Sequence, residues 1–322
     1  MNDPSRLVEF IENSFLAPLL QRRDITDITY NGEAIYYDDR FHGHRASSIR
    51  VDNDTVGAFL RQLANMSEKQ FSYLSANLDI HFGRYRLNAT FFSICRVYER
   101  KAYSFALRIG SEGSAIDLNP SFFPPGTKEI LLKALEKHES IVIAGETGSG
   151  KTELQKYLLM HLKDATRVIV IDNIGELELC RGEGLIDLTF WQADENYPDS
   201  SYASLIRNAL RNSPEYLILA EARGKEMVEA LQAAMSGHPI ITTLHAKDLE
   251  AVPFRMARLA QGTSGKDGYE DVLADIYHHF SLIVYLGKQN KGGEVLRYVQ
   301  SIGRLVEKTR QIEILYERKA EE

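Results

Sequence analysis

The chain has 322 residues, of which 44% are hydrophobic and 26% charged, a composition typical of a globular protein with about two domains. No apolar run is long enough to span a bilayer, and the N-terminal segment lacks the basic start and apolar block of a secretory signal. The net charge of −7 argues against a protein devoted to coating nucleic acid.

The first hundred or so residues predict a domain of mixed α and β structure. Apolar residues at helical spacing predict a helix beginning near Leu7 and a second helix over residues 56–66. The Asn-Gly pair within residues 27–37 predicts two strands joined by a turn. Alternation of apolar and polar residues predicts further strands over 84–92 and 103–108.

A change in composition follows at residues 110–126, which hold glycines, serines and three prolines. Such a stretch is typical of a linker. We therefore predict an N-terminal α+β domain over residues 1–110, a linker over 111–127 and a C-terminal domain over 128–322.

The C-terminal domain contains short and nearly continuous apolar runs, separated by helix-like segments. Strands that are buried on both faces have this pattern, which is typical of a parallel sheet flanked by helices. The sequence therefore predicts an α/β domain with strands at residues 141–144, 168–171, 216–220 and 240–244.

Residues 145–152 read GETGSGKT and fit the phosphate-binding pattern G-x-x-x-x-G-K-[ST] in full. The glycines let the backbone curl so that its N–H groups converge on phosphate oxygens, and the N-terminus of the next helix adds partial positive charge. We expect Lys151 to reach the β- and γ-phosphates of ATP and the Thr152 hydroxyl to hold Mg²⁺. The predicted binding residues of this loop are Gly145, Glu146, Thr147, Gly148, Ser149, Gly150, Lys151 and Thr152.

Acidic residues follow two of the predicted parallel strands. Glu221 ends the strand over 216–220, and Asp172 ends the strand over 168–171, with Glu176 a few residues later. Ligands of open α/β sheets bind at this carboxyl edge, and an NTP hydrolase needs an acid there to order Mg²⁺ or the attacking water. An acid in such a place is also often a turn residue or a helix cap, so the pairing with the phosphate-binding loop is what favours a catalytic role.

One predicted strand, residues 240–244, has a histidine at each end. His245 follows the strand, where its side chain could hydrogen-bond the γ-phosphate or an acid. His238 precedes the strand, and we expect it to serve as a capping or interface residue.

Four motifs resemble, in the same order along the chain, motifs of the hexameric secretion ATPases. Those ATPases power type IV secretion, conjugation, type II secretion and type IV pili. Besides the phosphate-binding loop, IDNIGEL at 171–177 is similar to the family's aspartate box and SGHPIITTLHA at 236–246 to its histidine box. LRNSPEYLILAEARG at 210–224 is similar to its Walker B region. DITDITYNG at 24–32 and RYRLNA at 84–89 extend the resemblance into the N-terminal half.

This resemblance implies a RecA-like C-terminal domain in a ring of six subunits that bind ATP and Mg²⁺ between their two domains. Arginines of the N-terminal domain would then reach the phosphates, and the candidates are Arg84, Arg86 and Arg108. An arginine that acts on γ-phosphate charge contributes on the order of 10³-fold in rate. The alternative is that these strand arginines only solubilise the sheet.

The sequence departs from the family at the aspartate box, where Asp172-Asn173 replaces the usual Glu-Asp. Glu176 keeps the second acid, so we predict that Glu176, rather than Asp172, polarises the attacking water. We assign Glu221 to Mg²⁺, together with Thr152, and to water ordering, with Arg223 beside it in a charge network.

The two cysteines, Cys95 and Cys180, do not form a metal-ligand spacing and favour a reducing compartment. The zinc-binding tetracysteine of type II assembly ATPases is therefore not expected, which favours the type IV secretion or retraction branches. By resemblance, the partners are other copies of the chain and platform proteins of the inner membrane, at whose cytoplasmic face the chain would be bound peripherally. We expect no specific nucleic-acid binding.

Two other functions are compatible with the same motifs. A RecA-like nucleic-acid translocase would be stimulated by DNA, although the acidic chain has no aromatic-basic cluster. A structural ring subunit would bind nucleotide with little turnover, which the altered aspartate box allows.

Overall fold

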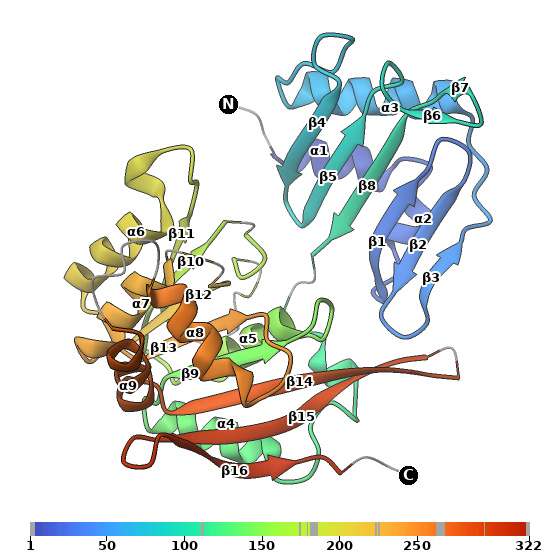
Figure 1. Cartoon of the computed structure of the whole chain (residues 1–322). Helices are drawn as coiled ribbons and strands as arrows, with labels where there is room; N and C mark the ends of the chain where they lie inside the picture. The colour runs from blue at the N-terminus through green and yellow to red at the C-terminus, as the bar shows by residue number, and fades with distance from the viewer. Residues whose placement is uncertain are drawn as a thin grey trace. The chain divides into compact units, whose positions relative to one another are not determined.

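The computed structural model describes residues 4–110, 113–173, 175–178, 180, 186–222, 224, 226–261, 268–292 and 294–319. The internal contacts divide the chain into a first unit, residues 1–112 with 290–295, and a second unit, residues 113–289 with 296–322. Figure 1 shows that each unit has its own sheet and helices.

The first unit is a six-stranded antiparallel sheet in the order β3-β2-β1-β8-β5-β4, with the helices α1, α2 and α3 packed against it (Figure 1). Its helices are α1 (Pro4–Glu12), α2 (Ala17–Leu20) and α3 (Asn53–Met66). Its sheet strands are β1 (Ile25–Tyr30), β2 (Ile35–Asp39), β3 (Gly43–Ala46), β4 (Asn77–Phe82), β5 (Tyr85–Thr90) and β8 (Ser104–Ile109). A separate small hairpin joins β6 (Arg96–Val97) to β7 (Arg100–Lys101).

Local sequence explains the elements that it predicts in this unit. The side chain of Asn31 accepts hydrogen bonds from the backbone N–H groups of Glu33 and Ala34, which closes the predicted turn between β1 and β2. Asp52 caps α3 by accepting a hydrogen bond from the Thr55 N–H at 2.8 Å. The predicted helices near residue 7 and over 56–66 and the predicted strands are present, while α2, β3, β4 and the hairpin of β6 and β7 were not predicted.

The second unit contains an eight-stranded sheet in the order β11-β10-β12-β13-β9-β14-β15-β16. The strands from β11 to β14 in this order are parallel to their neighbours, and β16 is antiparallel to β15. The bounds are β9 (Ile141–Gly145), β10 (Arg167–Asp172), β11 (Asp187–Gln192), β12 (Tyr216–Leu219), β13 (Ile240–Leu244), β14 (Leu282–Lys291), β15 (Glu294–Val306) and β16 (Gln311–Glu317). The four predicted strands are β9, β10, β12 and β13, so the predicted mainly parallel α/β fold is confirmed.

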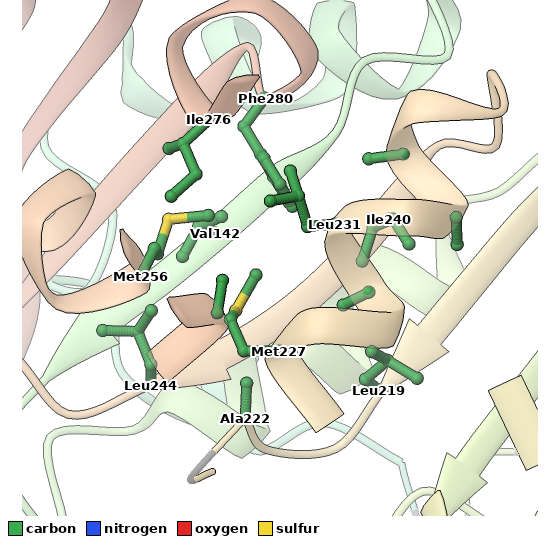
Figure 2. Packing of buried hydrophobic residues seen from close by; sticks show 14 of the residues in the cluster. Val142, Leu219, Ala222, Met227, Leu231, Ile240, Leu244, Met256, Ile276 and Phe280 are labelled. Atoms are coloured by element: carbon green, nitrogen blue, oxygen red, sulfur yellow. The ribbon is translucent and has the colours of Figure 1, made fainter. Parts of the chain in front are cut away.

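Helices cover both faces of this sheet and bury two apolar cores. One core contains residues of α6, α7, α8 and α9, and Figure 2 shows Met227 and Leu231 of α7 beside Val142 and Leu244 of the sheet. The other core contains residues of α4 and α5. The helices are α4 (Thr127–Glu136), α5 (Lys151–Met160), α6 (Tyr202–Ala209), α7 (Glu226–Met235), α8 (Ala251–Gln261) and α9 (Tyr269–His279), with short 3₁₀ turns at Ile116–Leu118, Pro198–Ser200 and Leu210–Asn212.

Much of the predicted linker contributes to the second unit. Ile116 and Phe122 are buried in the core beneath α4 and α5, and the Ser114 hydroxyl donates to the Glu153 carbonyl of α5 at 3.0 Å. The proposed limits 1–110, 111–127 and 128–322 stay a prediction, but the described residues from 113 onwards pack as part of the second unit.

The edge strand β11 was not predicted. It pairs in parallel with β10, so that Trp191 lies opposite Ile171 and Gln192 opposite Asp172. Its residues are exposed or only partly buried, as expected for a strand at the sheet edge.

Candidate nucleotide-binding site

The phosphate-binding loop connects β9 to α5. Its backbone needs glycine at two places: Gly150 has a positive φ of 100°, and a Cβ on Gly145 would lie 2.6 Å from the Ser149 hydroxyl oxygen. The first helical residue of α5 is Lys151, so the N-terminal N–H groups of α5 face the loop. This strand-loop-helix arrangement is the one that the sequence pattern predicts for phosphate binding.

The ammonium group of Lys151 is held inside this loop. It donates to the carbonyl oxygens of Gly145 and Glu146, both at 3.0 Å, and lies 3.3 Å from Nδ1 of His245. Only 9% of Lys151 is exposed. The lysine is therefore oriented along the loop, with its charge at the end of the loop that His245 approaches.

His245 connects Lys151 to Glu221. Its Nε2 lies 3.3 Å from a carboxylate oxygen of Glu221, so the ring is placed between an ammonium group and a carboxylate. Glu221 follows β12 and His245 follows β13, and the hydroxyl of Thr243 donates to the Ala220 carbonyl at 2.7 Å, which ties these strand ends together. The structure thus brings three predicted site residues into one contact chain at the carboxyl edge of the sheet.

The aspartate box has a different local organisation. Asp172 is buried at the end of β10, and its carboxylate accepts a hydrogen bond from the Leu177 N–H at 3.2 Å. Burial and, secondarily, the Asp172 charge raise the pKa of Tyr202. Asp172 therefore fixes the turn in which Glu176 lies, half-buried, and the catalytic role of Glu176 stays a prediction. Arg223 lies outside the described residues.

His238 lies at the amino end of β13, opposite to the site. Its Nδ1 is 3.1 Å from the Ser236 hydroxyl oxygen, a contact within its own turn. The predicted difference between the two histidines therefore agrees with their places on β13.

A group of residues on β15 and in the predicted linker supports the loop, and no sequence motif indicates it. Arg297 donates from Nε to the Gly148 carbonyl at 2.7 Å, and the Asn119 amide donates to the Arg297 carbonyl at 2.8 Å. The ring of Phe122 lies against Gly150. Because Arg297 and Gly148 are 149 positions apart, only the folded sheet reveals this contact.

A cavity of about 780 Å³ opens beside the loop. Its lining includes Glu146, Thr147 and His245 from the site and Lys247, Arg255 and Arg258 from the segment after β13 and from α8. The Tyr285 hydroxyl donates to the Lys247 carbonyl at 2.5 Å, which fixes the start of that segment. The cavity therefore extends the site with cationic side chains that the motifs do not include.

The predicted arginines of the first unit are each placed beside a carboxylate of that unit. Arg84 lies 3.3 Å from Glu12, Arg86 lies 3.6 Å from Asp79, and Arg108 lies 3.2 Å from Asp27. Arg86 and Arg108 stand opposite each other on β5 and β8. Whether any of the three acts on ATP stays a prediction.

The oxygen donors of the site suit Mg²⁺. The Thr152 hydroxyl and the Glu221 carboxylate are hard oxygen ligands of the kind that Mg²⁺ prefers, and both residues are partly accessible. In the described part of the chain, no cluster of three or more His, Cys, Asp and Glu side chains could form a metal site of its own. These donors fit a metal that arrives with the nucleotide.

The chain is similar to known proteins over much of its length. The family model described as type II/IV secretion system protein matches residues 100–277. The chain is 26% identical over 298 residues to the uncharacterized protein pXO2-25 of Bacillus anthracis, covering 89% of this chain and 65% of that protein. It is 34% identical over 162 residues to the type IV secretion system protein VirB11 of Brucella suis, covering 48% of this chain and 45% of that protein. The matches therefore span less than two thirds of these relatives.

Among solved structures, the chain is similar to the ATPase DotB of Legionella pneumophila. The TM-score is 0.70 at 23% sequence identity, and the match covers 95% of this chain and 82% of DotB. This similarity supports the fold. Among the described helices, none has the length and apolar character needed to cross a membrane.

Proposed function

Because this chain belongs to the type II/IV secretion system protein family, we propose that it is a traffic ATPase that powers a type IV secretion, conjugation or pilus machine. The observation that carries the proposal is the contact chain from Lys151 through His245 to Glu221 beside a complete phosphate-binding loop. The similarity to VirB11 and to the ATPase DotB supports the same function.

In this function the substrate is ATP, and the chemical step is hydrolysis of its terminal phosphoanhydride. A water oxygen bonds to the γ-phosphorus, the bond from that phosphorus to the β–γ bridging oxygen breaks, and ADP and inorganic phosphate form. We assign polarisation of the water to Glu176, which accepts its proton, and assign Lys151 to the negative charge on the β- and γ-phosphates. Mg²⁺ held by Thr152 and Glu221 would supply further charge neutralisation.

His245 is placed to respond to the state of the nucleotide. Since its two ring nitrogens face Lys151 and Glu221, a change in charge at the γ-phosphate alters the contacts on both sides of the ring. We assign His245 the role of linking phosphate occupancy to the strand ends of β12 and β13.

The assembly that we propose is a ring of six copies at the cytoplasmic face of the inner membrane, bound peripherally to platform proteins of the machine. Arg86 and Arg108 would act on the phosphates within that ring, and Arg84 would help to bind the nucleotide. Native mass spectrometry with and without ATP tests the ring, and a monomer under all conditions contradicts it.

The hydrolysis proposal is tested by phosphate release from ATP and Mg²⁺. We expect turnover by the wild-type chain, and a loss of about 10²-fold in Glu176→Gln and in Glu221→Gln with nucleotide binding retained. Glu178→Gln is the matched control, because Glu178 is an exposed carboxylate two positions from Glu176. Absence of turnover in the wild type would leave the structural ring subunit as the better function, and strong stimulation by DNA would favour the translocase.

A further inference from the structure

The cavity beside the phosphate-binding loop has a strongly cationic wall. Lys247, Arg255 and Arg258 line it, against the single carboxylate of Glu146. All three cationic residues are exposed, and within the described parts of the chain no carboxylate forms an ion pair with them. Unpaired cations that line a concave surface attract anions, because the cavity wall focuses their field.

The position of this cavity relative to ATP follows from Lys151. The lysine of such a loop reaches the β- and γ-phosphates, and here its ammonium group lies 3.3 Å from His245. His245 also lines the cavity, together with Glu146 and Thr147 of the loop. The cavity therefore opens at the terminal-phosphate end of the site.

The cationic wall is built on a fixed element. Arg255 and Arg258 are three positions apart on α8 and so lie on the same side of the helix. Val252 and Met256 of the same helix are fully buried in the core, and Asp248 accepts a hydrogen bond from the Ala251 N–H at 2.8 Å at the helix start. The part of α8 that carries both arginines is therefore fixed beside the loop.

We propose that this wall, formed by Lys247, Arg255 and Arg258, is a binding site for inorganic phosphate that leaves the γ-position after hydrolysis. The inference rests on the proposed function, since hydrolysis of ATP supplies the phosphate. Phosphate passes His245 to the arginines of α8 while ADP stays on the loop. Guanidinium groups suit this ligand because they donate pairs of hydrogen bonds to phosphate oxygens.

Direct binding tests the site without turnover. Inorganic phosphate is titrated calorimetrically into the wild-type chain saturated with ADP and Mg²⁺, so that the loop is already filled. We expect the dissociation constant for phosphate to rise about tenfold in Arg255→Gln and in Arg258→Gln, since each removes a charge-assisted hydrogen bond. Arg258→Lys should restore part of the affinity. Lys163→Gln, which removes an exposed charge after α5, should leave it unchanged.

Turnover gives the second measurement. Added phosphate should inhibit ATP hydrolysis by the wild-type chain, and the inhibition constant should rise by the same factor in both glutamine variants. Equal phosphate affinity in wild type and both variants overturns the proposal, as does a change in oligomer mass with no change in phosphate affinity. If phosphate binds in an arginine-dependent way but the wild type does not hydrolyse ATP, the proposed function fails and the phosphate site stands.

Discussion

The cationic side chains of the two units differ in what surrounds them. In the first unit, Arg86 and Arg108 lie beside Asp79 and Asp27, carboxylates of their own sheet. In the second unit, the ammonium of Lys151 is held by backbone carbonyls and His245. Arg255 and Arg258 line a cavity beside it.

This difference decides how each cationic side chain could bind phosphate. Lys151 is held by carbonyl oxygens and His245, whereas Arg86 and Arg108 would exchange an aspartate for the phosphate. A carbonyl oxygen orients an ammonium group without neutralising its charge, whereas a carboxylate neutralises its partner. Exposed pairs such as Arg86–Asp79 contribute only about 0–1 kcal/mol, so a phosphate can replace the aspartate at small cost. Arg86 and Arg108 of the first unit are therefore suited to bind phosphate only after they release their aspartates, whereas Lys151 of the second unit is already oriented along the phosphate-binding loop.

The largest expected effect concerns Lys151 of the second unit. Lys151→Ala should reduce ATP turnover by at least about 10³-fold, because the charge that faces the β- and γ-phosphates is removed. Phosphate release and binding of a fluorescent ATP analogue measure this, with Lys163→Ala as the control for loss of a lysine from the same unit. Substantial turnover in Lys151→Ala would contradict the site.

The role of Arg86 in the first unit is tested by separate substitutions of Arg86 and of its partner Asp79. If Arg86 acts on γ-phosphate charge, Arg86→Gln should lower turnover on the order of 10³-fold. Asp79→Asn should leave turnover nearly unchanged or raise it, since it releases the arginine. Equal and small effects of both substitutions on turnover, with only a slight shift in the melting temperature, would show that Arg86 merely solubilises the sheet.

A smaller effect is expected where Arg297 supports the loop. Arg297→Gln removes the charge-assisted hydrogen bond to the Gly148 carbonyl, so the dissociation constant for nucleotide should rise about tenfold. Turnover at saturating ATP should change little, because Arg297 acts on the loop backbone. Arg310→Gln, at an exposed arginine before β16, is the control. A loss confined to turnover at saturation would assign Arg297 to catalysis instead.

The smallest effect concerns Tyr85, which connects Arg84 to Glu12. Burial, and then the nearby Glu12, raise the pKa of Tyr85 to about 12, above the usual value of about 10. Between about pH 10 and pH 12 the folded chain therefore keeps the Tyr85 proton that the unfolded chain loses. The contribution of Tyr85 to the free energy of unfolding is present below about pH 10 and is lost as pH rises towards 12. Unfolding monitored by circular dichroism should show a shallower alkaline loss of stability in Tyr85→Phe. Identical slopes would contradict the prediction.

The sequence predicted those parts of the fold in which burial is uniform. Apart from Arg167 at the start of β10, the strands β9, β10, β12 and β13 are buried along their length, so their apolar runs were visible without the structure. The family resemblance is likewise confirmed by the match of the family model. The edge strands β11 and β16 were missed because their exposed and half-buried residues give no continuous apolar signal. The strands β14 and β15 were also not predicted, although β14 begins with a buried apolar run.

The sequence predicted those residues of the candidate site that lie next to a helix or strand with a clear local pattern. Lys151, Glu221 and His245 each follow or begin an element with a clear pattern, and the parallel sheet brings these element ends together. Arg297 and the arginines of α8 had no such signal, because they resemble ordinary polar residues of a strand and a helix. Their importance arises only from the pairing of distant strands and from the packing of α8.

Trp191 on β11 gives the site a built-in optical reporter. It is the only tryptophan of the chain, and it lies opposite Ile171, directly before the Asp172 that fixes the turn with Glu176. Partial burial makes indole emission sensitive to small changes in solvent access. Any rearrangement of that turn during a nucleotide cycle can therefore be followed by stopped-flow fluorescence, without a dye and without an engineered residue.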